Sequence, residues 1–354
     1  MSLSTLRYAA ITIAITLALD FVVTLFIPAA TLDSWVAARD RDAQIYDRTV
    51  AWHHDIRPNL DTTRLWGQDR YAFRSDRHGF RTGRCAAAGT PEEKDKAVLI
   101  VGDSFAEGLG LPFENAFAGL LACALRERGL VASNLGTMGY SPVIYHRKIA
   151  EAVRRLGYPP REIVLFLDIS DIHNDAVDYV EIAGRVHSER PTLARRAKDF
   201  LKHNFTSFAV IFEINQRYLV THATPMTVLN NKLSRWTVDK DLFAAWGERG
   251  LATVAANLEK VVAQCRSWNC RLTLVVYPWP DQVAAQDRDS IQVRYWRDWS
   301  ARHDVSFVDA FAPFFALPAD ETIKRYFIRG DVHFNTEGSR LVFDAVWRAI
   351  SDAR

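Results

Sequence analysis

The strongest constraint on the fold is a series of short strand candidates separated by amphipathic stretches. The first, Ala97 to Val101, is a β-branched apolar run that stops at Gly102, and further candidates lie at 131–135, 162–168, 271–277 and 305–308. Short apolar runs bounded by turn residues are typical of strands buried on both faces of a parallel sheet. The sequence therefore predicts five strands of this kind.

Helical patterns fill the intervals between these strands. Apolar residues recur at helical spacing between Leu251 and Cys265, and further helices are expected at 115–128, 141–156, 290–303 and 336–350. Strands that alternate with helices imply a parallel sheet with helices on both faces. We therefore predict an α/β protein of three layers, α/β/α, with a five-stranded parallel sheet.

Other segments flank or interrupt this core. Residues 1–30 are predicted to form an N-terminal transmembrane signal anchor, residues 31–95 an extension with short strands packed on the main domain, and residues 96–354 the main domain. Within that domain, residues 176–248 break the alternation and mix basic with aromatic residues. We interpret them as a helical insertion that caps the carboxyl edge of the sheet.

The predicted anchor is an almost uninterrupted apolar stretch from Tyr8 to Ala30. At about 1.5 Å per residue its helix reaches roughly 34 Å, which is enough to cross a bilayer core. A cleaved signal peptide has a shorter apolar region of about 7–15 residues, so we favour an uncleaved anchor. Asp20 costs roughly 2.5–3.5 kcal/mol at the centre of a span. It is either a tolerated polar residue or a contact with a partner helix.

Composition excludes several classes of function. The net charge of +2, from 44 basic and 42 acidic residues, gives no electrostatic case for binding nucleic acid. The sequence has no zinc-type cysteine pattern and no phosphate-cradling GxxxxGKS/T loop. Cys265 and Cys270 bracket a predicted helix-to-strand turn and are candidates for a disulfide in an oxidising compartment. Alternatively, Cys123 and Cys265 are small buried apolar residues.

The first candidate for chemistry is Ser104, in a Gly-Asp-Ser-Phe segment directly after the first predicted strand. Ligands of open α/β sheets bind at the carboxyl ends of the strands, so the Ser104 hydroxyl lies at the edge where a substrate binds. A serine hydroxyl becomes a good nucleophile only when a base takes its proton. The alternative is a turn serine that caps the next helix.

The second candidate is the pair Asp331 and His333, just before the last predicted helix. Side chains two residues apart in an extended segment point the same way. Asp331 can therefore accept a hydrogen bond from one imidazole nitrogen and leave the other nitrogen for the Ser104 proton. Such a carboxylate fixes the histidine tautomer and stabilises the imidazolium that forms. The alternative is a loop histidine with an incidental acidic neighbour.

Together, the strand followed by Gly-Asp-Ser and the Asp-x-His before the final helix resemble the SGNH (GDSL-like) hydrolase superfamily. The resemblance covers residues 96–354 without the insertion. It implies a flavodoxin-like fold, with Ser104 as the nucleophile and His333 as the base supported by Asp331. It implies no cofactor and no metal.

The resemblance also implies an oxyanion hole. The backbone N–H of Ser104 contributes, together with a glycine after the second strand, for which Gly139 is the better match and Gly136 the second. The family carries an asparagine soon after the third strand, but here that position holds Ser170, and Asn174 follows four residues later. Either Ser170 donates its hydroxyl instead, which we favour, or Asn174 reaches the site after a turn of helix. A lost oxyanion donor costs roughly a hundred- to a thousandfold in rate.

Two further residues are candidates for contact with the substrate. Asp103 precedes the nucleophile, and Trp279 follows the fourth strand at the same edge of the sheet. The Trp279 ring either stacks on a sugar or simply packs in the core. Four histidines lack the spacing of a metal site, so we expect none there: His53, His54, His78 and His173.

These features predict a serine esterase that acts on acyl esters, O-acetyl esters foremost, of an extracytoplasmic polysaccharide. The same residues serve an O-acyltransferase that moves an acyl group from a membrane acyl-donor protein onto a cell-surface glycan. A non-catalytic glycan-binding or scaffold protein of a membrane complex is the second alternative, favoured by the missing asparagine. We expect a single-pass protein of the inner membrane, in contact with the lipid bilayer, whose main domain is periplasmic.

Overall fold

The structure is a computed structural model that describes residues 3–26, 44–49, 51–67, 69–85, 95–188 and 193–352. It divides into a small unit, Met1–Ile45 with Arg190–His222, and a larger unit, Tyr46–Glu189 with Ala223–Arg354. The larger unit contains the main sheet and every candidate catalytic residue.

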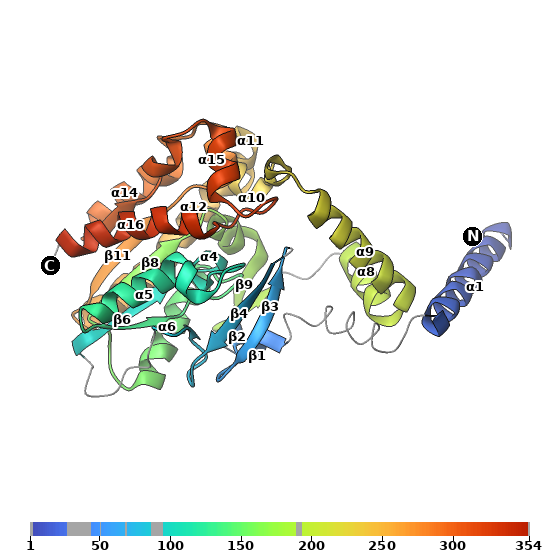
Figure 1. Ribbon diagram of the computed structural model, residues 1–354, viewed down its shortest axis with the longest axis horizontal. Coiled ribbons are helices and arrows are strands. Elements are labelled where there is room, and N and C mark those ends of the chain that lie inside the picture. The colour runs from blue at the N-terminus through green and yellow to red at the C-terminus, as the bar shows by residue number, and fades with distance from the viewer. Residues whose placement is uncertain are drawn as a thin grey trace. The chain divides into compact units, whose positions relative to one another are not determined.

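Parallel strands form the centre of the larger unit (Figure 1), in the order β12-β11-β8-β6-β7. Their bounds are β6 Ala97–Val101, β7 Val131–Asn134, β8 Glu162–Leu167, β11 Arg271–Val276 and β12 Ser306–Asp309. Every residue of β6 and β8 is buried, as expected for strands covered on both faces. The five predicted strands are confirmed, and the first of them, β6, lies between the second and the third.

The extension adds antiparallel strands to the same sheet. These are β3 (Asp61–Trp66), β4 (Asp69–Ser75) and β5 (Arg81–Thr82), and β5 pairs with β7 through Arg81 and Asn134. Within the described residues the sheet is therefore mixed and has eight strands. The prediction of a purely parallel, five-stranded sheet is wrong in this respect. Strands rich in polar residues lack the apolar run from which a buried strand is predicted.

Helices cover both faces of the parallel strands. α5 (Phe117–Glu127) packs against α16 (Thr336–Asp352), and α6 (Pro142–Leu156) packs against α12 (Glu248–Ser267). α5 connects β6 to β7, and α6 connects β7 back across β6 to β8, so the two connections run in opposite directions along the sheet. Right-handed crossovers then place α5 and α6 on opposite faces, and the predicted three layers are present. Other α-helices that the structure describes in the larger unit are α4 (Ser104–Glu107), α7 (Asp171–His173), α10 (Lys232–Arg235), α11 (Lys240–Leu242), α13 (Pro280–Ala284), α14 (Ile291–His303) and α15 (Ala319–Tyr326).

Two β-hairpins of the larger unit lie outside the main sheet. β1 (Tyr46–Thr49) pairs with β2 (His53–Ile56), and β9 (Tyr179–Ile182) pairs with β10 (Arg185–Ser188). β2 and β10 also contact each other. Segments of the extension and of the predicted insertion therefore meet in space.

The predicted insertion, 176–248, is divided between the two units. Residues 190–222 belong to the small unit, whereas residues 176–189 and 223–248 belong to the larger one. In the larger unit the Trp236 side chain is buried, and its Nε1 donates to the carbonyl oxygen of Ile169 at 3.2 Å. The interval is thus divided between the two units, and its role as a cap over the sheet edge stays a prediction.

In the part of the small unit that the structure describes lie α1 (Leu3–Phe26), α8 (Leu193–Asn204) and α9 (Thr206–His222). Asp20 of α1 accepts hydrogen bonds from the backbone N–H (2.7 Å) and the hydroxyl (2.9 Å) of Ser207 in α9. The interpretation of Asp20 as a contact with a partner helix is therefore confirmed, and the partner is a helix of the same chain.

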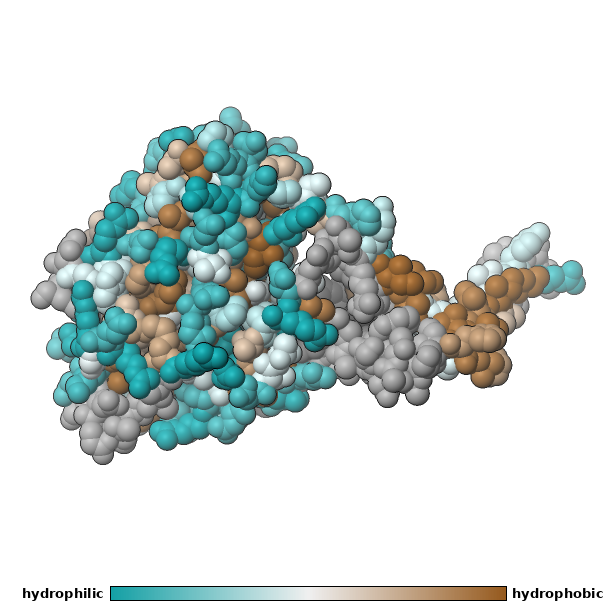
Figure 2. Space-filling view, in the orientation of Figure 1, coloured by the Kyte–Doolittle hydropathy of each residue, from teal (hydrophilic) through white to brown (hydrophobic). Residues whose placement is uncertain are grey.

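The side chains described on α1 are largely apolar and exposed, and Figure 2 shows dense apolar colouring on this helix. Among the residues that the structure describes, however, no helix has both the length and the apolar character needed to span a membrane. This finding does not support the predicted transmembrane anchor. Residues 27–30 of that prediction lie outside the described residues.

Disulfides link Cys265 to Cys270 and Cys85 to Cys123. The first is the predicted pair, at the turn between α12 and β11. The second ties the end of the extension to α5, so Cys123 is a paired residue and not merely a small apolar one.

Candidate active site

Ser104 lies at the carboxyl end of β6, at the first position of α4. The strand leaves the sheet through Gly102, where a Cβ atom would lie 2.7 Å from the Ala106 Cβ and 3.0 Å from the Phe166 carbonyl oxygen. Asp103 caps α4, because its Oδ1 accepts the N–H of Phe105 at 2.9 Å. The strand order reverses at β6, and such switch points are where open α/β sheets bind ligands.

The structure brings Ser104, His333 and Asp331 together in one line of hydrogen bonds. His333 Nε2 is 2.9 Å from Ser104 Oγ, although 229 positions separate the two residues. On the other side of the ring, His333 Nδ1 is 2.5 Å from Asp331 Oδ1, and the same oxygen accepts the His333 backbone N–H at 2.9 Å. A carboxylate accepts, so Nδ1 carries the proton and Nε2 is free to take one from Ser104.

The local charges favour a basic His333. Burial lowers the pKa of His333, but the attraction and hydrogen bond of Asp331, with smaller contributions from Asp103 and Asp168, raise it above its usual value. Burial raises the pKa of Asp331, but His333 outweighs this and holds it below its usual value. The pair therefore stabilises the charged imidazolium that a proton from Ser104 would create.

Asp103 is a structural partner of Ser104. Its side chain is buried, and its Oδ2 lies 3.2 Å from Ser104 Oγ. Burial and then the charge of Asp168 raise its pKa well above the usual value. The Asp103 side chain therefore makes its contacts inside the protein and not at a surface that a substrate could reach.

Two backbone N–H groups beside the hydroxyl have no acceptor. Within the described part of the chain, neither the Ser104 N–H nor the Gly139 N–H donates a hydrogen bond to a protein atom. Gly139 has φ of +76°, which favours glycine. The N–H of Gly136, by contrast, is taken by the Asn134 side chain at 2.9 Å. Of the two candidate glycines, Gly139 has the free donor.

The two candidates for the donor after the third strand, Ser170 and Asn174, both bond to other side chains. The Ser170 hydroxyl donates to Asp168 Oδ1 at 2.5 Å, and the Asn174 side-chain amide donates to Asp178 Oδ2 at 2.7 Å. A hydroxyl has one proton, so Ser170 has none left for a substrate oxygen in this arrangement. The Trp279 side chain is 4% exposed, and its Nε1 donates to Asp168 Oδ2 at 2.7 Å, which favours packing over contact with a sugar.

Residues from the extension complete the site, and no sequence pattern pointed to them. Trp66 of β3 donates from Nε1 to Asp331 Oδ2 at 3.0 Å, and its ring meets the His333 ring edge-on, with centroids 5.9 Å apart. Arg64 of the same strand forms a buried ion pair with Glu107 of α4, at 2.7 Å. The extension therefore contacts both His333 and the helix that carries Ser104.

The histidines outside the site have other partners. His54 bonds to the Met138 carbonyl oxygen, His78 stacks on Phe80, and His173 bonds to Asp178. The described residues contain no group of three or more His, Cys, Asp or Glu side chains arranged to hold a metal ion.

No protein-family model matches the sequence, and a search among curated proteins finds no match. Solved structures that align with the chain include an acetylxylan esterase from Geobacillus stearothermophilus, determined as a catalytic mutant (15% identity, 74% of this chain, 95% of that chain, TM-score 0.40). Another is a psychrotrophic esterase from Pseudoalteromonas sp. (12% identity, 73% of this chain, 98% of that chain, TM-score 0.36). A third is a GDSL-like lipase from Bacteroides thetaiotaomicron (11% identity, 76% of this chain, 93% of that chain, TM-score 0.38). These TM-scores are below 0.5, so we interpret this chain from its own geometry.

Proposed function

We propose that this protein is a serine hydrolase of acyl esters of the SGNH type, with Ser104 as nucleophile, His333 as base and Asp331 as the carboxylate that orients the base. The observation that carries the proposal is the continuous line from Ser104 Oγ through both nitrogens of His333 to Asp331. A serine that only capped α4 would need neither neighbour, and the cap of α4 is already supplied by Asp103.

The geometry supports a double displacement. His333 Nε2 takes the proton as Ser104 Oγ attacks the ester carbonyl carbon, and the carbonyl oxygen becomes an oxyanion. The free N–H groups of Ser104 and Gly139 are the donors for that oxyanion. The imidazolium then gives its proton to the leaving alcohol oxygen as the C–O bond breaks, and an acyl-enzyme remains. His333 next removes a proton from water, and the second displacement releases the acid and restores Ser104.

The acceptor in the second displacement decides between hydrolase and transferase. If a sugar hydroxyl replaces water, the same residues make an O-acyltransferase. We propose an acetyl ester of a polysaccharide as the substrate, and for the transferase alternative a separate acyl-donor protein. A non-catalytic binding role is the remaining alternative, because Ser170 and Asn174 are both engaged with carboxylates.

A fluorophosphonate probe tests for an activated serine. We expect labelling of the wild type, no labelling of Ser104→Ala, and unchanged labelling of the matched control Ser306→Ala, an exposed serine at the far edge of the sheet. Hydrolysis of 4-nitrophenyl acetate, with and without an oligosaccharide acceptor, separates esterase from transferase. Well-folded wild type that neither labels nor hydrolyses the ester would contradict the proposed enzyme and support the binding role.

We also propose that the protein works outside the cytoplasm, at a membrane surface. The disulfides Cys85–Cys123 and Cys265–Cys270 support an oxidising compartment. The exposed apolar side chains of α1 support association with lipid. Alkylation of thiols in intact cells, with and without prior reduction, tests the compartment. Free thiols before reduction would contradict it. Flotation with liposomes tests the association, and protein that stays unbound would contradict it.

A further inference from the structure

The loop that carries Gly139 is fixed on the helix that carries the nucleophile. Thr137 N–H donates to the Gly102 carbonyl oxygen at 3.2 Å. Gly136 packs so closely on α4 that a Cβ atom there would lie 2.5 Å from the Glu107 nitrogen. Glu107 Oε2 also accepts the Met138 N–H at 2.7 Å. The position of the loop is therefore set by α4, but the direction of the Gly139 N–H needs one more constraint.

His54 of β2 supplies that constraint. Its Nε2 is 2.7 Å from the carbonyl oxygen of Met138. That oxygen and the Gly139 N–H belong to one planar trans peptide and point in opposite directions. A side chain that holds the oxygen therefore holds the N–H as well. On the other side of the residue, the Tyr179 hydroxyl donates to the Gly139 carbonyl oxygen.

A chain of hydrogen bonds fixes the tautomer of His54. The Met138 oxygen can only accept, so His54 Nε2 carries a proton. Burial lowers the pKa of His54, so the ring is neutral and its Nδ1 is an acceptor. His53 Nδ1 lies 2.7 Å from that atom and must donate to it. His53 Nε2 in turn accepts from the Ser188 hydroxyl at 2.5 Å.

Further observations support a role for this pair. Burial, followed by repulsion from the cationic Arg48 nearby, lowers the pKa of His53 to about 4. Both rings are therefore neutral near pH 7. His53 also has φ of +85°, a conformation that costs free energy for a residue with a side chain and that often marks a functional position.

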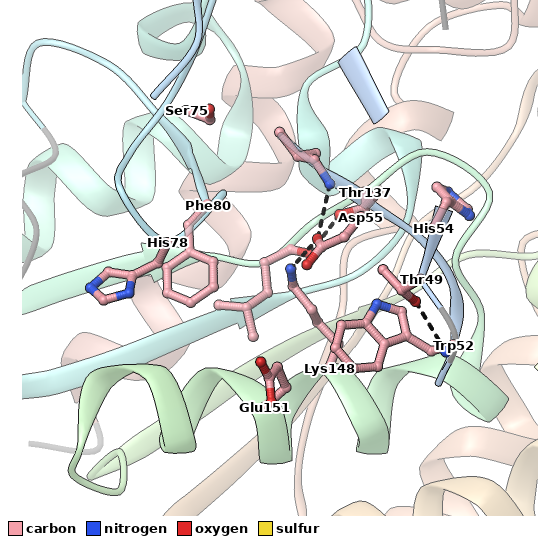
Figure 3. A network of polar contacts seen from close by, with 12 residues as sticks. Thr49, Trp52, His54, Asp55, Ser75, His78, Phe80, Thr137, Lys148 and Glu151 are labelled. Carbon is pink, nitrogen blue, oxygen red and sulfur yellow. Dashed lines mark hydrogen bonds and ion pairs between the residues drawn. The ribbon is translucent and has the colours of Figure 1, made fainter. Parts of the chain in front are cut away.

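The strand that carries His54 is itself held by buried charges. Asp55 forms ion pairs with Lys148 and, at 3.1 Å, with Arg155, both on α6. Figure 3 shows Lys148 extending from α6 to Asp55 on β2. The Tyr140 hydroxyl donates to the His54 carbonyl oxygen at 2.7 Å. β2 is thus held in place next to the loop that it orients.

We propose that His54, held in one tautomer by His53, is a positioning residue that aims the Gly139 N–H at the substrate oxyanion. The inference rests on the proposed function. It matters for this chain because Ser170 donates to Asp168, which leaves backbone N–H groups as the main donors of the hole. A misdirected Gly139 N–H weakens transition-state binding and leaves the ground state little changed.

The test compares His54→Phe with His54→Gln on an acetyl ester. Phenylalanine keeps ring contacts with Tyr46 and Tyr140 but cannot donate, whereas the glutamine amide can donate near the position of Nε2. We expect His54→Phe to lower kcat roughly ten- to a hundredfold, below the loss for a donor removed outright, with little change in KM. We expect His54→Gln to recover most of kcat. Inhibition by a trifluoromethyl ketone, whose adduct carries an oxyanion, should weaken in parallel with kcat.

Two outcomes overturn the inference while leaving the proposed function intact. One is an active wild type in which His54→Phe leaves kcat unchanged, whether or not KM changes. The other comes from ¹⁵N NMR of histidine-labelled wild type, which needs no variant to fold: a proton on Nδ1 of neutral His54 contradicts the tautomer. A folded wild type with no esterase activity and no probe labelling overturns the proposed function, and this inference with it.

Discussion

Replacement of Asp331 by asparagine tests how the carboxylate is used. Three donors converge on it: the His333 backbone N–H and Nδ1 on one oxygen, and Trp66 Nε1 on the other. An amide has only one acceptor oxygen, so Asp331→Asn cannot satisfy both sides. If the oxygen faces His333, the amide NH2 meets the Trp66 N–H. If the NH2 faces His333, the ring must place its proton on Nε2, and Ser104 loses its base.

The size of the effect follows from this competition. Loss of the correct tautomer in a Ser-His-Asp triad lowers kcat by about 10⁴, which is about 5.4 kcal/mol in the activation barrier. An unsatisfied buried donor costs about 1–3 kcal/mol. Removal of the Trp66 donor therefore favours the productive amide orientation by a comparable free energy. We expect Trp66→Phe to lower kcat a few-fold in the wild type but to raise it about tenfold in Asp331→Asn.

The assay is a double-mutant cycle of kcat and kcat/KM on 4-nitrophenyl acetate, with thermal unfolding as a check that each variant is folded. Opposite signs of the Trp66→Phe effect in the two backgrounds are the expected result. The same sign in both backgrounds, or wild-type activity of Asp331→Asn, would refute the assignment of Asp331 as the residue that orients the base.

Three further predictions concern pH and stability. kcat/KM should rise with pH as His333 deprotonates, with a midpoint above the ordinary pKa of histidine. Because folding raises the pKa of His333, protonated His333 also stabilises the fold at low pH, and this stability is lost as the pH rises through that pKa. A midpoint at or below the ordinary value contradicts this. Arg64→Met leaves the buried Glu107 carboxylate without its paired cation and should lower the free energy of unfolding in urea by about 3–5 kcal/mol. The partly exposed control Arg74→Met should lower it by at most about 1 kcal/mol, and equal losses would contradict the prediction. Removal of Cys85–Cys123, which spans 38 residues, should cost about 4 kcal/mol by calorimetry, and an unchanged melting temperature contradicts it.

The parallel core could be predicted from the sequence because each of its strands has a recognisable local pattern of residues. The β6 and β8 segments are apolar runs buried on both faces, and α12 has a regular apolar stripe. The antiparallel strands β3 and β4 carry mixed polar residues, and their place is set by pairing with each other and, through β5, with the edge of the sheet. Pairing of this kind is a non-local property that periodicity does not report.

Some residues of the candidate site could likewise be predicted from local sequence, and others could not. Ser104, Asp331 and His333 could be predicted as candidates because each lies at a strand end or in a short motif whose geometry is local. Trp66 and His54 could not, because their roles depend on which atoms lie opposite them after folding. His54 was considered only for metal binding, since a histidine in a sequence gives no sign of which carbonyl oxygen it will hold.

The placement of Arg64 and Trp66 explains why the extension belongs to the sheet that carries the site. The two residues are two positions apart on β3, so their side chains share one face of the strand. From that face Arg64 pairs with Glu107 on the nucleophile helix, and Trp66 bonds to Asp331 behind the base. A slip of β3 by one residue against β4 would turn both side chains to the opposite face. The register of a strand without catalytic residues therefore controls the orientation of both halves of the candidate catalytic site.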